Sequence, residues 1–288
     1  MGLILDGKLI SKKVKNSLQE KIAGCTTKFG RKPGLATVLV GVDPASKLYV
    51  GMKIKACDHV GIYSENITLP EHCTYSQLVE ALHELNSKNE IDGILLQLPL
   101  PSHLRDKTDE IVQDISPEKD VDGLSPHTMG LTNMGDETYT AATPKGMIRL
   151  LEEYNIEIKG KEVVIVNRSI IIGKPLVMMF LKRNGTVTVC HTKTKDINFH
   201  MKRADILVTG VGRANFVTSE RIKEGVVYLD AGINHDENGK LCGDGDYLGI
   251  KDKCSAITPV PGGVGPMTIA MLMENTYLSF LKRMKKNS

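Results

Sequence analysis

Tyr49 and Lys53 are the first residues in the sequence whose types and spacing could do chemistry. They lie four residues apart in a predicted helix, so their side chains share one face and can touch. Gln97 interrupts an apolar run at the end of a predicted strand, which is where ligands bind in open α/β sheets. Asp122 follows in a turn-rich loop, although Asp120 and Asp122 could both be Asx-turn residues. A catalytic group is one explanation of this pattern, and surface packing of the Tyr49–Lys53 pair is the simpler one.

A second candidate site is the turn that joins a predicted strand over 162–166 to a predicted helix over 175–183. Unpaired backbone N–H groups and the helix dipole make such a turn suitable for an anion. Gly173 would allow a pyrophosphate to approach the backbone, and Asn167 tolerates a positive φ better than most residues. The turn lacks the G-x-G-x-x-G pattern, so an ordinary turn without a ligand is an equal alternative.

The charges near this turn bear on the type of cofactor. NAD-binding folds usually carry an Asp or Glu about 20 residues after the glycine turn. Residues 190–195 contain no carboxylate, whereas Arg168, Lys193 and Lys195 could surround a 2′-phosphate. This pattern favours NADP over NAD. The alternative is that the two lysines are solvated loop residues with no role in cofactor binding. A proline- and glycine-rich loop over 258–268 could also bring its backbone close to a ligand.

Alternating strands and helices must position these residues. Apolar runs predict strands and capping patterns predict helices, so we expect a parallel sheet covered on both faces, the second half being similar to a dinucleotide-binding sheet. The final helix should pack on the first half. The predicted strands cover 35–40, 62–68, 94–98, 162–166, 186–189, 205–209 and 226–230, and the predicted helices include 44–60, one opened by the Thr74–Gln77 capping box, one led by Thr143-Pro144, 175–183 and 266–286.

Composition excludes several classes of protein. The chain has 288 residues, 41% of them hydrophobic and 25% charged, which is typical of a soluble globular protein. The net charge of +3 comes from the basic C-terminal end, and Trp is absent, so nucleic-acid binding is not expected. The six cysteines form no C-x-x-C pair, which argues against a metal site or a disulfide framework. We therefore expect a cytoplasmic protein that has no membrane span.

Taken together and in order, six segments resemble the bifunctional methylenetetrahydrofolate dehydrogenase/cyclohydrolase family over nearly the whole chain. The segments are 40–50 with Lys53, 92–101, 117–123, Arg168-Ser169 with Gly173, 230–234 and 259–268. The resemblance implies two α/β domains flanking a cleft, with the last helix returning to the N-terminal domain. It implies a folate-binding domain over 1–141, completed by 267–288, and a Rossmann-like NADP-binding domain over 142–266.

The resemblance also implies the activity. The family oxidises 5,10-methylenetetrahydrofolate with NADP and hydrolyses the methenyl product to 10-formyltetrahydrofolate. Lys53 would be the catalytic lysine, supported by Tyr49, Gln97 and Asp122, which also bind the folate. The segment 261–265, with Pro261, Gly262 and Gly263, would close over the substrate. The resemblance also implies a homodimer, the usual state of the family. The residues expected to meet NADP are Asn167, Arg168, Ser169, Gly173, His191, Thr192 and Ile233.

Hydrolysis needs proton transfers, for which an ordinary charged lysine is a poor base. We therefore expect burial to lower the pKa of Lys53, and a hydrogen bond donated by Gln97 to favour the neutral amine. The sequence departs from the family at Asn167, where Gly is usual, and at Thr192, which keeps the hydroxyl of the usual Ser. Two alternatives remain: a monofunctional dehydrogenase, and a non-catalytic folate- or nucleotide-binding protein of the same fold.

Overall fold

The computed structural model describes residues 2–286, and it divides the chain into two compact α/β units. The three-stranded unit comprises residues 12–142 and the chain from 269 onward, and the six-stranded unit comprises residues 2–11 and 143–268. Residue 1 and residues 287–288, at the limits of the predicted domains, lie outside the described range. No helix within that range is long and apolar enough to cross a membrane.

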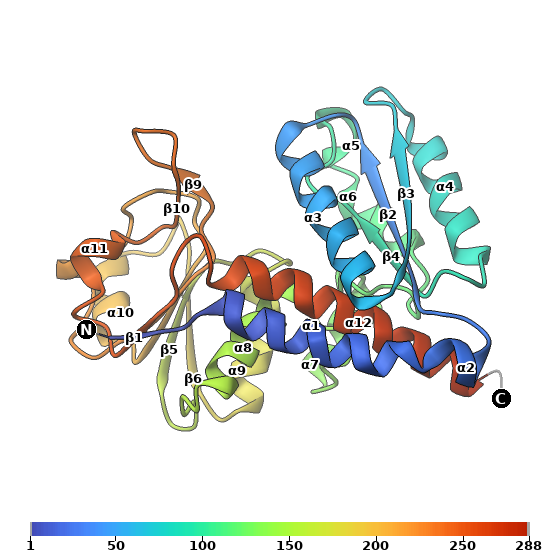
Figure 1. Cartoon of the computed structure of the whole chain (residues 1–288). Helices are drawn as coiled ribbons and strands as arrows, with labels where there is room; N and C mark the ends of the chain where they lie inside the picture. The colour runs from blue at the N-terminus through green and yellow to red at the C-terminus, as the bar shows by residue number, and fades with distance from the viewer. Residues whose placement is uncertain (1, 287–288) are drawn as a thin grey trace. The chain divides into compact units, whose positions relative to one another are not determined.

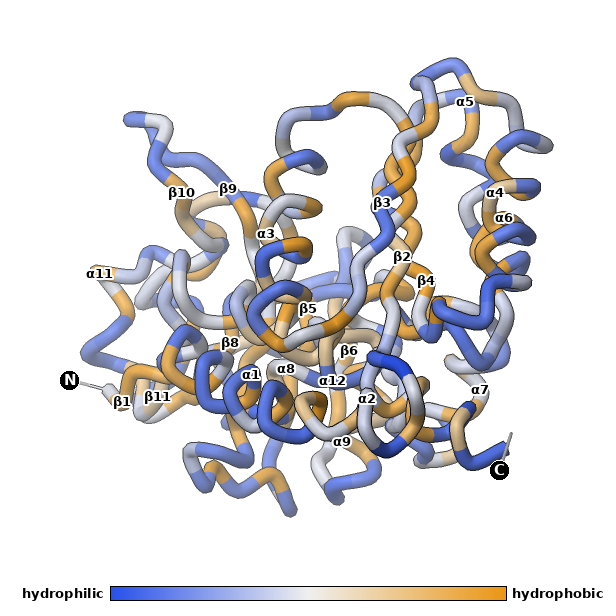
Figure 2. Tube along the Cα trace, turned by 45° about the vertical axis from the view of Figure 1, so that its right-hand side comes forward, coloured by the Kyte–Doolittle hydropathy of each residue, from blue (hydrophilic) through white to orange (hydrophobic). Residues whose placement is uncertain are grey.

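The three-stranded unit is built on a parallel sheet of β2 (Gly34–Val40), β3 (Tyr63–Leu69) and β4 (Gly93–Leu96), with β2 in the middle. Every residue of β2 is buried, which explains its continuous apolar sequence. Figure 2 shows β2 as a largely hydrophobic segment. The helices α3 (Pro44–Val60) and α4 (Tyr75–Ser87) lie on opposite sides of this sheet (Figure 1). The predicted parallel sheet covered on both faces is confirmed here.

Local signals set the ends of these two helices. The side chain of Asp43 accepts a hydrogen bond from the Ser46 N–H at the start of α3, and Gly61 ends that helix in the left-handed conformation. The predicted capping box at Thr74 and Gln77 is present at the start of α4. The other helices with residues in this unit are α1 (Gly7–Ala23), α2 (Cys25–Phe29), α5 (Ser102–Arg105), α6 (Thr108–Ile111), η1 (Val112–Asp114), α7 (Pro126–Asn133) and α12 (Val264–Lys286).

The last helix returns to the first half of the chain, as predicted. The Asn275 amide of α12 donates to the carbonyls of Val121 and Thr140. One turn from the end of α12, Arg283 pairs with the fully buried carboxylate of Asp92, which also receives a two-pronged contact from Arg31. These contacts make α12 part of the three-stranded unit from residue 269 onward.

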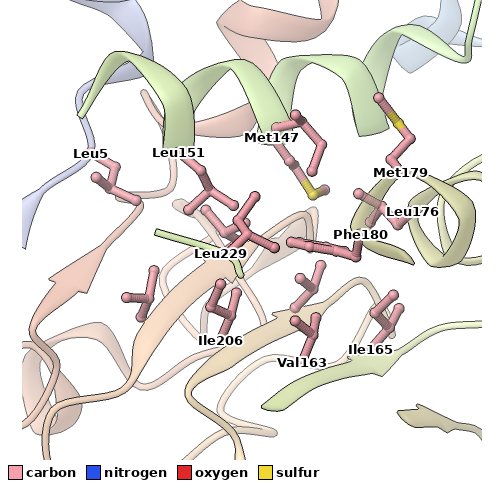
Figure 3. Packing of buried hydrophobic residues seen from close by; sticks show 14 of the residues in the cluster. Leu5, Met147, Leu151, Val163, Ile165, Leu176, Met179, Phe180, Ile206 and Leu229 are labelled. Atoms are coloured by element: carbon pink, nitrogen blue, oxygen red, sulfur yellow. The ribbon is translucent and has the colours of Figure 1, made fainter. Parts of the chain in front are cut away.

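The six-stranded unit holds a parallel sheet in the order β1-β11-β8-β7-β5-β6. Met147 and Leu151 of α8 and Phe180 of α9 pack over Val163 and its neighbours on one face of the sheet (Figure 3). The strands are β1 (Leu3–Ile4), β5 (Glu162–Val166), β6 (Thr186–Cys190), β7 (Ile206–Thr209), β8 (Val227–Asp230) and β11 (Ala256–Ile257), with an antiparallel pair β9 (Asn234–His235) and β10 (Leu241–Cys242). The helices are α8 (Ala142–Glu153), α9 (Gly173–Lys182), α10 (Ile197–Arg203), η2 (Ser219–Arg221) and α11 (Tyr247–Ile250).

Two details of the predicted organisation are wrong. The first residues do not belong with the rest of 1–141, because β1 joins the six-stranded sheet through hydrogen bonds from Leu3 to Ser255 and from Leu5 to Ile257. Thr143 is not a helix N-cap, because α8 already begins at Ala142. Both features depend on residues that are far away in the sequence. The Thr143 hydroxyl, for example, is hydrogen-bonded to the Thr268 hydroxyl.

Candidate functional site

Lys53 and Gln97 meet in the three-stranded unit. Lys53 lies on α3, Gln97 directly follows β4, and the distance from Lys53 Nζ to Gln97 Oε1 is 2.9 Å. Gln97 Nε2 in turn donates to the carbonyl of Leu98 at 2.7 Å. β4 ends at Leu96, and the Gln97 N–H still donates to the Val38 carbonyl of β2. The Gln97 amide therefore stands at the carboxyl end of the strand, the usual place for a ligand site in this type of sheet.

The direction of this hydrogen bond corrects the expectation from the sequence. A carbonyl can only accept, so the contact with Leu98 fixes the Gln97 NH₂ there and turns Oε1 toward Lys53. Gln97 therefore accepts from Lys53 rather than donating to it, and the contact suits an ammonium group as well as an amine. Burial alone lowers the pKa of Lys53, while the negative charge of Asp122 opposes that shift.

The charge of Lys53 acts on Asp122, and the pKa of Asp122 is itself shifted. Burial raises the pKa of Asp122 to about 6, Lys53 acts in the opposite direction, and Asp120 adds a smaller increase. Among the described residues, the Asp122 carboxylate forms no hydrogen bond, so its oxygens are available to a ligand. Near neutral pH, a group with this pKa can both hold and release a proton.

Of the two possible Asx-turn residues, Asp120 is the one that forms the turn. Its carboxylate is buried and accepts hydrogen bonds from the backbone N–H groups of Gly123, Leu124 and Ser125. Asp120 is therefore the residue that shapes the turn, and Asp122 is the one that the turn presents. Sequence reasoning left both roles open because the two carboxylates are two residues apart in a segment rich in turn formers.

Tyr49 lies on α3 one turn before Lys53 and is half-buried. Burial raises the pKa of its phenol, which keeps it protonated at neutral pH. The first candidate group thus offers an amine, an amide, a carboxylate and a neutral phenol from α3, the end of β4 and the loop after Asp120. No set of three or more His, Cys, Asp or Glu residues in the described chain is arranged to hold a metal ion.

The second candidate site, the turn between β5 and α9, is organised by the side chain of Asn167. Its Oδ1 accepts from the Ser169 N–H, the Ser169 hydroxyl and the Gly173 N–H, and its Nδ2 donates to the carbonyl of Gly210. Asn167 is not among the residues with positive φ in the described chain, so the turn does not use its tolerance of that conformation. Gly173 is needed by the protein itself, since a Cβ there would lie 2.2 Å from the Asn167 carbonyl oxygen.

The neighbouring strand brings further predicted cofactor residues to the same edge of the sheet. Val166 of β5 is paired in register with Cys190 of β6, so the residues after each strand emerge side by side. Arg168 and Thr192 are exposed there, and the His191 ring accepts a hydrogen bond from the Lys193 N–H. Asp196, the first carboxylate after β6 in the sequence, caps α10 through the Phe199 N–H. Ile233 lies after β8 and is largely exposed.

Two buried carboxylates that sequence reasoning did not assign shape the loops around this edge. Asp230 accepts hydrogen bonds from the N–H groups of Gly232, Asp244 and Gly245 and from the Tyr228 hydroxyl. Asp244 accepts from the N–H groups of Val211 and Arg213 and from the Asn234 amide. Asp230 stands at the end of an apolar strand, and a carboxylate in that position is a signal that the sequence alone could have provided. Asp244 follows β10, a two-residue strand that the sequence does not predict, so its glycine neighbours are the one hint in the sequence.

The loop with Pro261, Gly262 and Gly263 is held against the start of α1 within the six-stranded unit. The Lys8 N–H donates to the Gly262 carbonyl at 3.0 Å. A Cβ on Gly7 would lie 1.7 Å from the Gly263 carbonyl oxygen, so the two backbones approach as closely as glycine permits. The loop is therefore fixed from both sides, because α12 begins directly after it at Val264.

Comparison with known families identifies both halves of the chain. The model described as "Tetrahydrofolate dehydrogenase/cyclohydrolase, catalytic domain" matches residues 5–122. The model described as "Tetrahydrofolate dehydrogenase/cyclohydrolase, NAD(P)-binding domain" matches residues 141–284. The first match contains Lys53, Gln97 and Asp122, and the second contains the Asn167 turn.

Individual proteins agree with the family models. The bifunctional protein FolD of Lachnoclostridium phytofermentans is 48% identical over 275 residues, which cover 96% of each chain. The bifunctional FolD methylenetetrahydrofolate dehydrogenase/cyclohydrolase of Campylobacter jejuni superposes with a TM-score of 0.94, at 44% identity over 98% of this chain and 100% of that one. A Trypanosoma brucei methylenetetrahydrofolate dehydrogenase-cyclohydrolase, solved with NADP and an inhibitor, gives a TM-score of 0.93 at 33% identity, covering 98% of each chain.

Proposed function

Because the chain belongs to the tetrahydrofolate dehydrogenase/cyclohydrolase family, we propose specific roles in its two reactions for the residues described above. The protein is a bifunctional, NADP-dependent enzyme of one-carbon metabolism. It oxidises 5,10-methylenetetrahydrofolate to the 5,10-methenyl form and hydrolyses that product to 10-formyltetrahydrofolate. The alternatives of a monofunctional dehydrogenase and a non-catalytic binding protein are not favoured.

In the proposed hydrolysis, Lys53 is the group that moves protons. The methenyl product is a cation, and its hydrolysis consumes one water and releases one proton. Neutral Lys53 accepts the proton of the attacking water, and the lowered pKa of this amine increases its neutral fraction at a given pH. Gln97 fixes the position of Nζ through its Oε1. The contact between Lys53 and Gln97 is the single observation that carries this proposal.

Asp122 and Tyr49 are proposed to hold the folate. The carboxylate of Asp122 can accept hydrogen bonds from the amino and N–H groups of a pterin ring. Tyr49 offers an aromatic surface and a neutral hydroxyl one helical turn away from the catalytic amine. The loop with Pro261, Gly262 and Gly263 is proposed to cover the substrate, in keeping with its close and rigid backbone packing.

The residues after β5 and β6 fit the binding of NADP. Arg168 supplies a cation, Thr192 a hydroxyl and the turn its N–H groups, while the first carboxylate after β6, Asp196, is occupied as a helix cap. This set suits a 2′-phosphate better than the free ribose hydroxyls of NAD. Bound NADP supplies the hydride acceptor of the first reaction. The protein's own part is to hold the dinucleotide by its phosphates, with Ile233 as an apolar contact.

The decisive experiment replaces Lys53 with Met and measures the two activities separately. Hydrolysis of methenyltetrahydrofolate, which requires no NADP, should fall by about 10²–10⁴ because the proton acceptor is lost. Binding of a folate analogue should change only a few-fold. The matched control is Lys55→Met, an exposed lysine on the same helix that should leave both activities intact. Full hydrolysis in the Lys53→Met variant would overturn the proposed role.

Two features beyond the site complete the proposed function. A homodimer is proposed, because β6 is an edge strand of its sheet and exposes apolar side chains such as Val189. A cytoplasmic location is proposed as well, since all six cysteines are free thiols. Sedimentation equilibrium at micromolar concentration tests the first proposal, and a mass equal to the monomer would contradict it. Cell fractionation tests the second.

A further inference from the structure

We propose that Asn167 is a positioning residue that sets the β5–α9 turn in the shape required by the dinucleotide before the dinucleotide binds. The inference rests on the proposed function, in which this turn holds NADP. The resemblance described for the sequence implies Gly at this position, and the side chain of Asn167 forms four hydrogen bonds inside the site. No other side chain of the turn has as many partners within the described residues.

The hydrogen bonds divide the donors of the turn into two sets. The inner set consists of the N–H groups of Ser169 and Gly173, both bonded to Asn167 Oδ1, and the Ile172 N–H, bonded to the Ser169 hydroxyl. The outer set consists of the N–H groups of Arg168, Ile170 and Ile171, which have no hydrogen-bond partner among the described residues. Polar N–H groups of a folded turn need a partner, and the outer set can donate only to solvent or to a ligand.

Asn167 therefore decides which donors the ligand uses. Its side-chain oxygen, Oδ1, accepts a hydrogen bond from the Gly173 N–H at the amino end of α9, where an anion would otherwise bind. The phosphates are left to the outer N–H groups and to Arg168. The inner hydrogen bonds keep those outer groups in place, so less conformational entropy is lost when the cofactor binds.

An amide is the group that this position requires. The oxygen must accept three hydrogen bonds at once, and the NH₂ must donate to Gly210, which follows β7. That last contact ties the turn to the next strand of the sheet. Glycine offers neither function. Aspartate could still accept, but it could not donate to Gly210, and it would place a negative charge beside the phosphates.

The test compares Asn167→Gly and Asn167→Asp with the parent enzyme. The readouts are the Kd for NADP⁺ by isothermal titration calorimetry, the KM for NADP⁺ and kcat of the dehydrogenase, and hydrolysis of methenyltetrahydrofolate without NADP. We expect Asn167→Gly to raise the Kd and KM for NADP⁺ about fivefold, as for the net loss of one hydrogen bond that holds the turn, with a more unfavourable binding entropy. The kcat should stay within twofold, and hydrolysis should not change.

Asn167→Asp should weaken NADP⁺ more than Asn167→Gly, by about 20-fold or more, because charge repulsion is added. Asn184→Gly is the matched control, since Asn184 has a positive φ in a different turn of the same unit and glycine adopts that conformation readily. It should leave NADP⁺ affinity unchanged. Equal or tighter NADP⁺ binding by Asn167→Gly would overturn the inference. Failure of the parent enzyme to bind NADP⁺ would instead overturn the proposed function.

Discussion

Lys53 and Asp122 are coupled through charge, and burial moves the pKa of each toward the neutral range. Burial disfavours the charged form of both groups, so it lowers the pKa of the amine and raises that of the carboxyl group. Their mutual attraction limits both shifts. A pair of this kind can exchange protons with water and substrate near neutral pH, which is what the hydrolytic step requires.

The pH dependence of hydrolysis tests the role of the Lys53–Gln97 contact. In Gln97→Glu, a carboxylate replaces the neutral acceptor of Lys53 Nζ and stabilises the ammonium form, so the pKa of Lys53 should rise. The neutral amine is then reached only at higher pH, and the rate profile for hydrolysis should move upward by about one pH unit or more. Gln19→Glu, an exposed site on α1, is the control. A profile that does not move would show that Lys53 is not the titrating group.

Asp122 should also affect how stability depends on pH. Its pKa is about 6 in the folded protein and about 3.9 in an unfolded chain, so the unfolded state releases its proton first as the pH rises. The free energy of unfolding should therefore decrease between about pH 4 and pH 6, by up to about 3 kcal/mol from this group. Asp122→Asn should lack that decrease.

Urea denaturation at pH 4.5 and pH 7.5 measures this difference. Between the two pH values, the parent protein should lose more stability than Asp122→Asn does. Asp58→Asn, at an exposed position of α3, should follow the parent curve. Parallel curves for the parent and Asp122→Asn would contradict the raised pKa.

At the scale of elements, each candidate site sits where a strand passes into a loop or helix, and buried polar groups hold those junctions. Asp120 anchors the loop that presents Asp122. Asp230 and Asp244 anchor the loops after β8 and β7 in the six-stranded unit. These carboxylates satisfy backbone N–H groups that would otherwise be buried without partners, which makes the loops stiff.

The β5–α9 junction yields a prediction about Gly173. A Cβ at this position would lie 2.2 Å from the Asn167 carbonyl oxygen, and backbone must move to relieve the overlap. Gly173→Ala should destabilise the protein by about 2 kcal/mol and weaken NADP⁺ binding, measured by thermal unfolding and calorimetry. Gly130→Ala, inside α7 with open space around its Cβ, should instead be stabilising by about 0.5–1 kcal/mol. The same unfolding temperature for both variants would contradict this account.

At the scale of the whole molecule, the chain completes each unit with a distant segment. The N-terminal strand β1 adds to the six-stranded sheet, and α12 adds to the three-stranded unit. Both α1 and α12 contribute residues to both units. Contacts between segments that are far apart in the sequence therefore help to stabilise each unit.

Arg283 tests the contribution of α12. It pairs with the fully buried Asp92 and donates to the carbonyl of Ile91, so Arg283→Ala leaves part of the carboxylate uncompensated. Because Arg31 still pairs with Asp92, the expected loss is about 2 kcal/mol rather than the larger cost of an isolated buried charge. Chemical denaturation measures it. Lys285→Ala, exposed on the same helix, should change stability by less than about 0.5 kcal/mol, and equal effects would refute this role for Arg283.

Local patterns in the sequence determined most of the elements. The apolar run over 162–166 became β5, the Thr74–Gln77 pattern became the capping box of α4, and Asp43 with Gly61 bounded α3, because each signal acts between residues close in the chain. The types of the candidate site residues, from Lys53 to Arg168, were also evident from motifs in the sequence. Their roles in catalysis and binding stay predictions.

Tertiary structure decided how those residues meet. Lys53 and Gln97 are 44 residues apart in the sequence. The direction of their hydrogen bond depends on the Leu98 carbonyl, which accepts from the Gln97 NH₂ and which no motif specifies. The partners of Asn167 include Gly210, 43 residues away, and those of Asp244 lie on loops 31 and 33 residues before it. The sequence names the groups, but a hydrogen bond needs both partners within about 3 Å and aligned, and only the packing of strands into sheets brings distant groups so close.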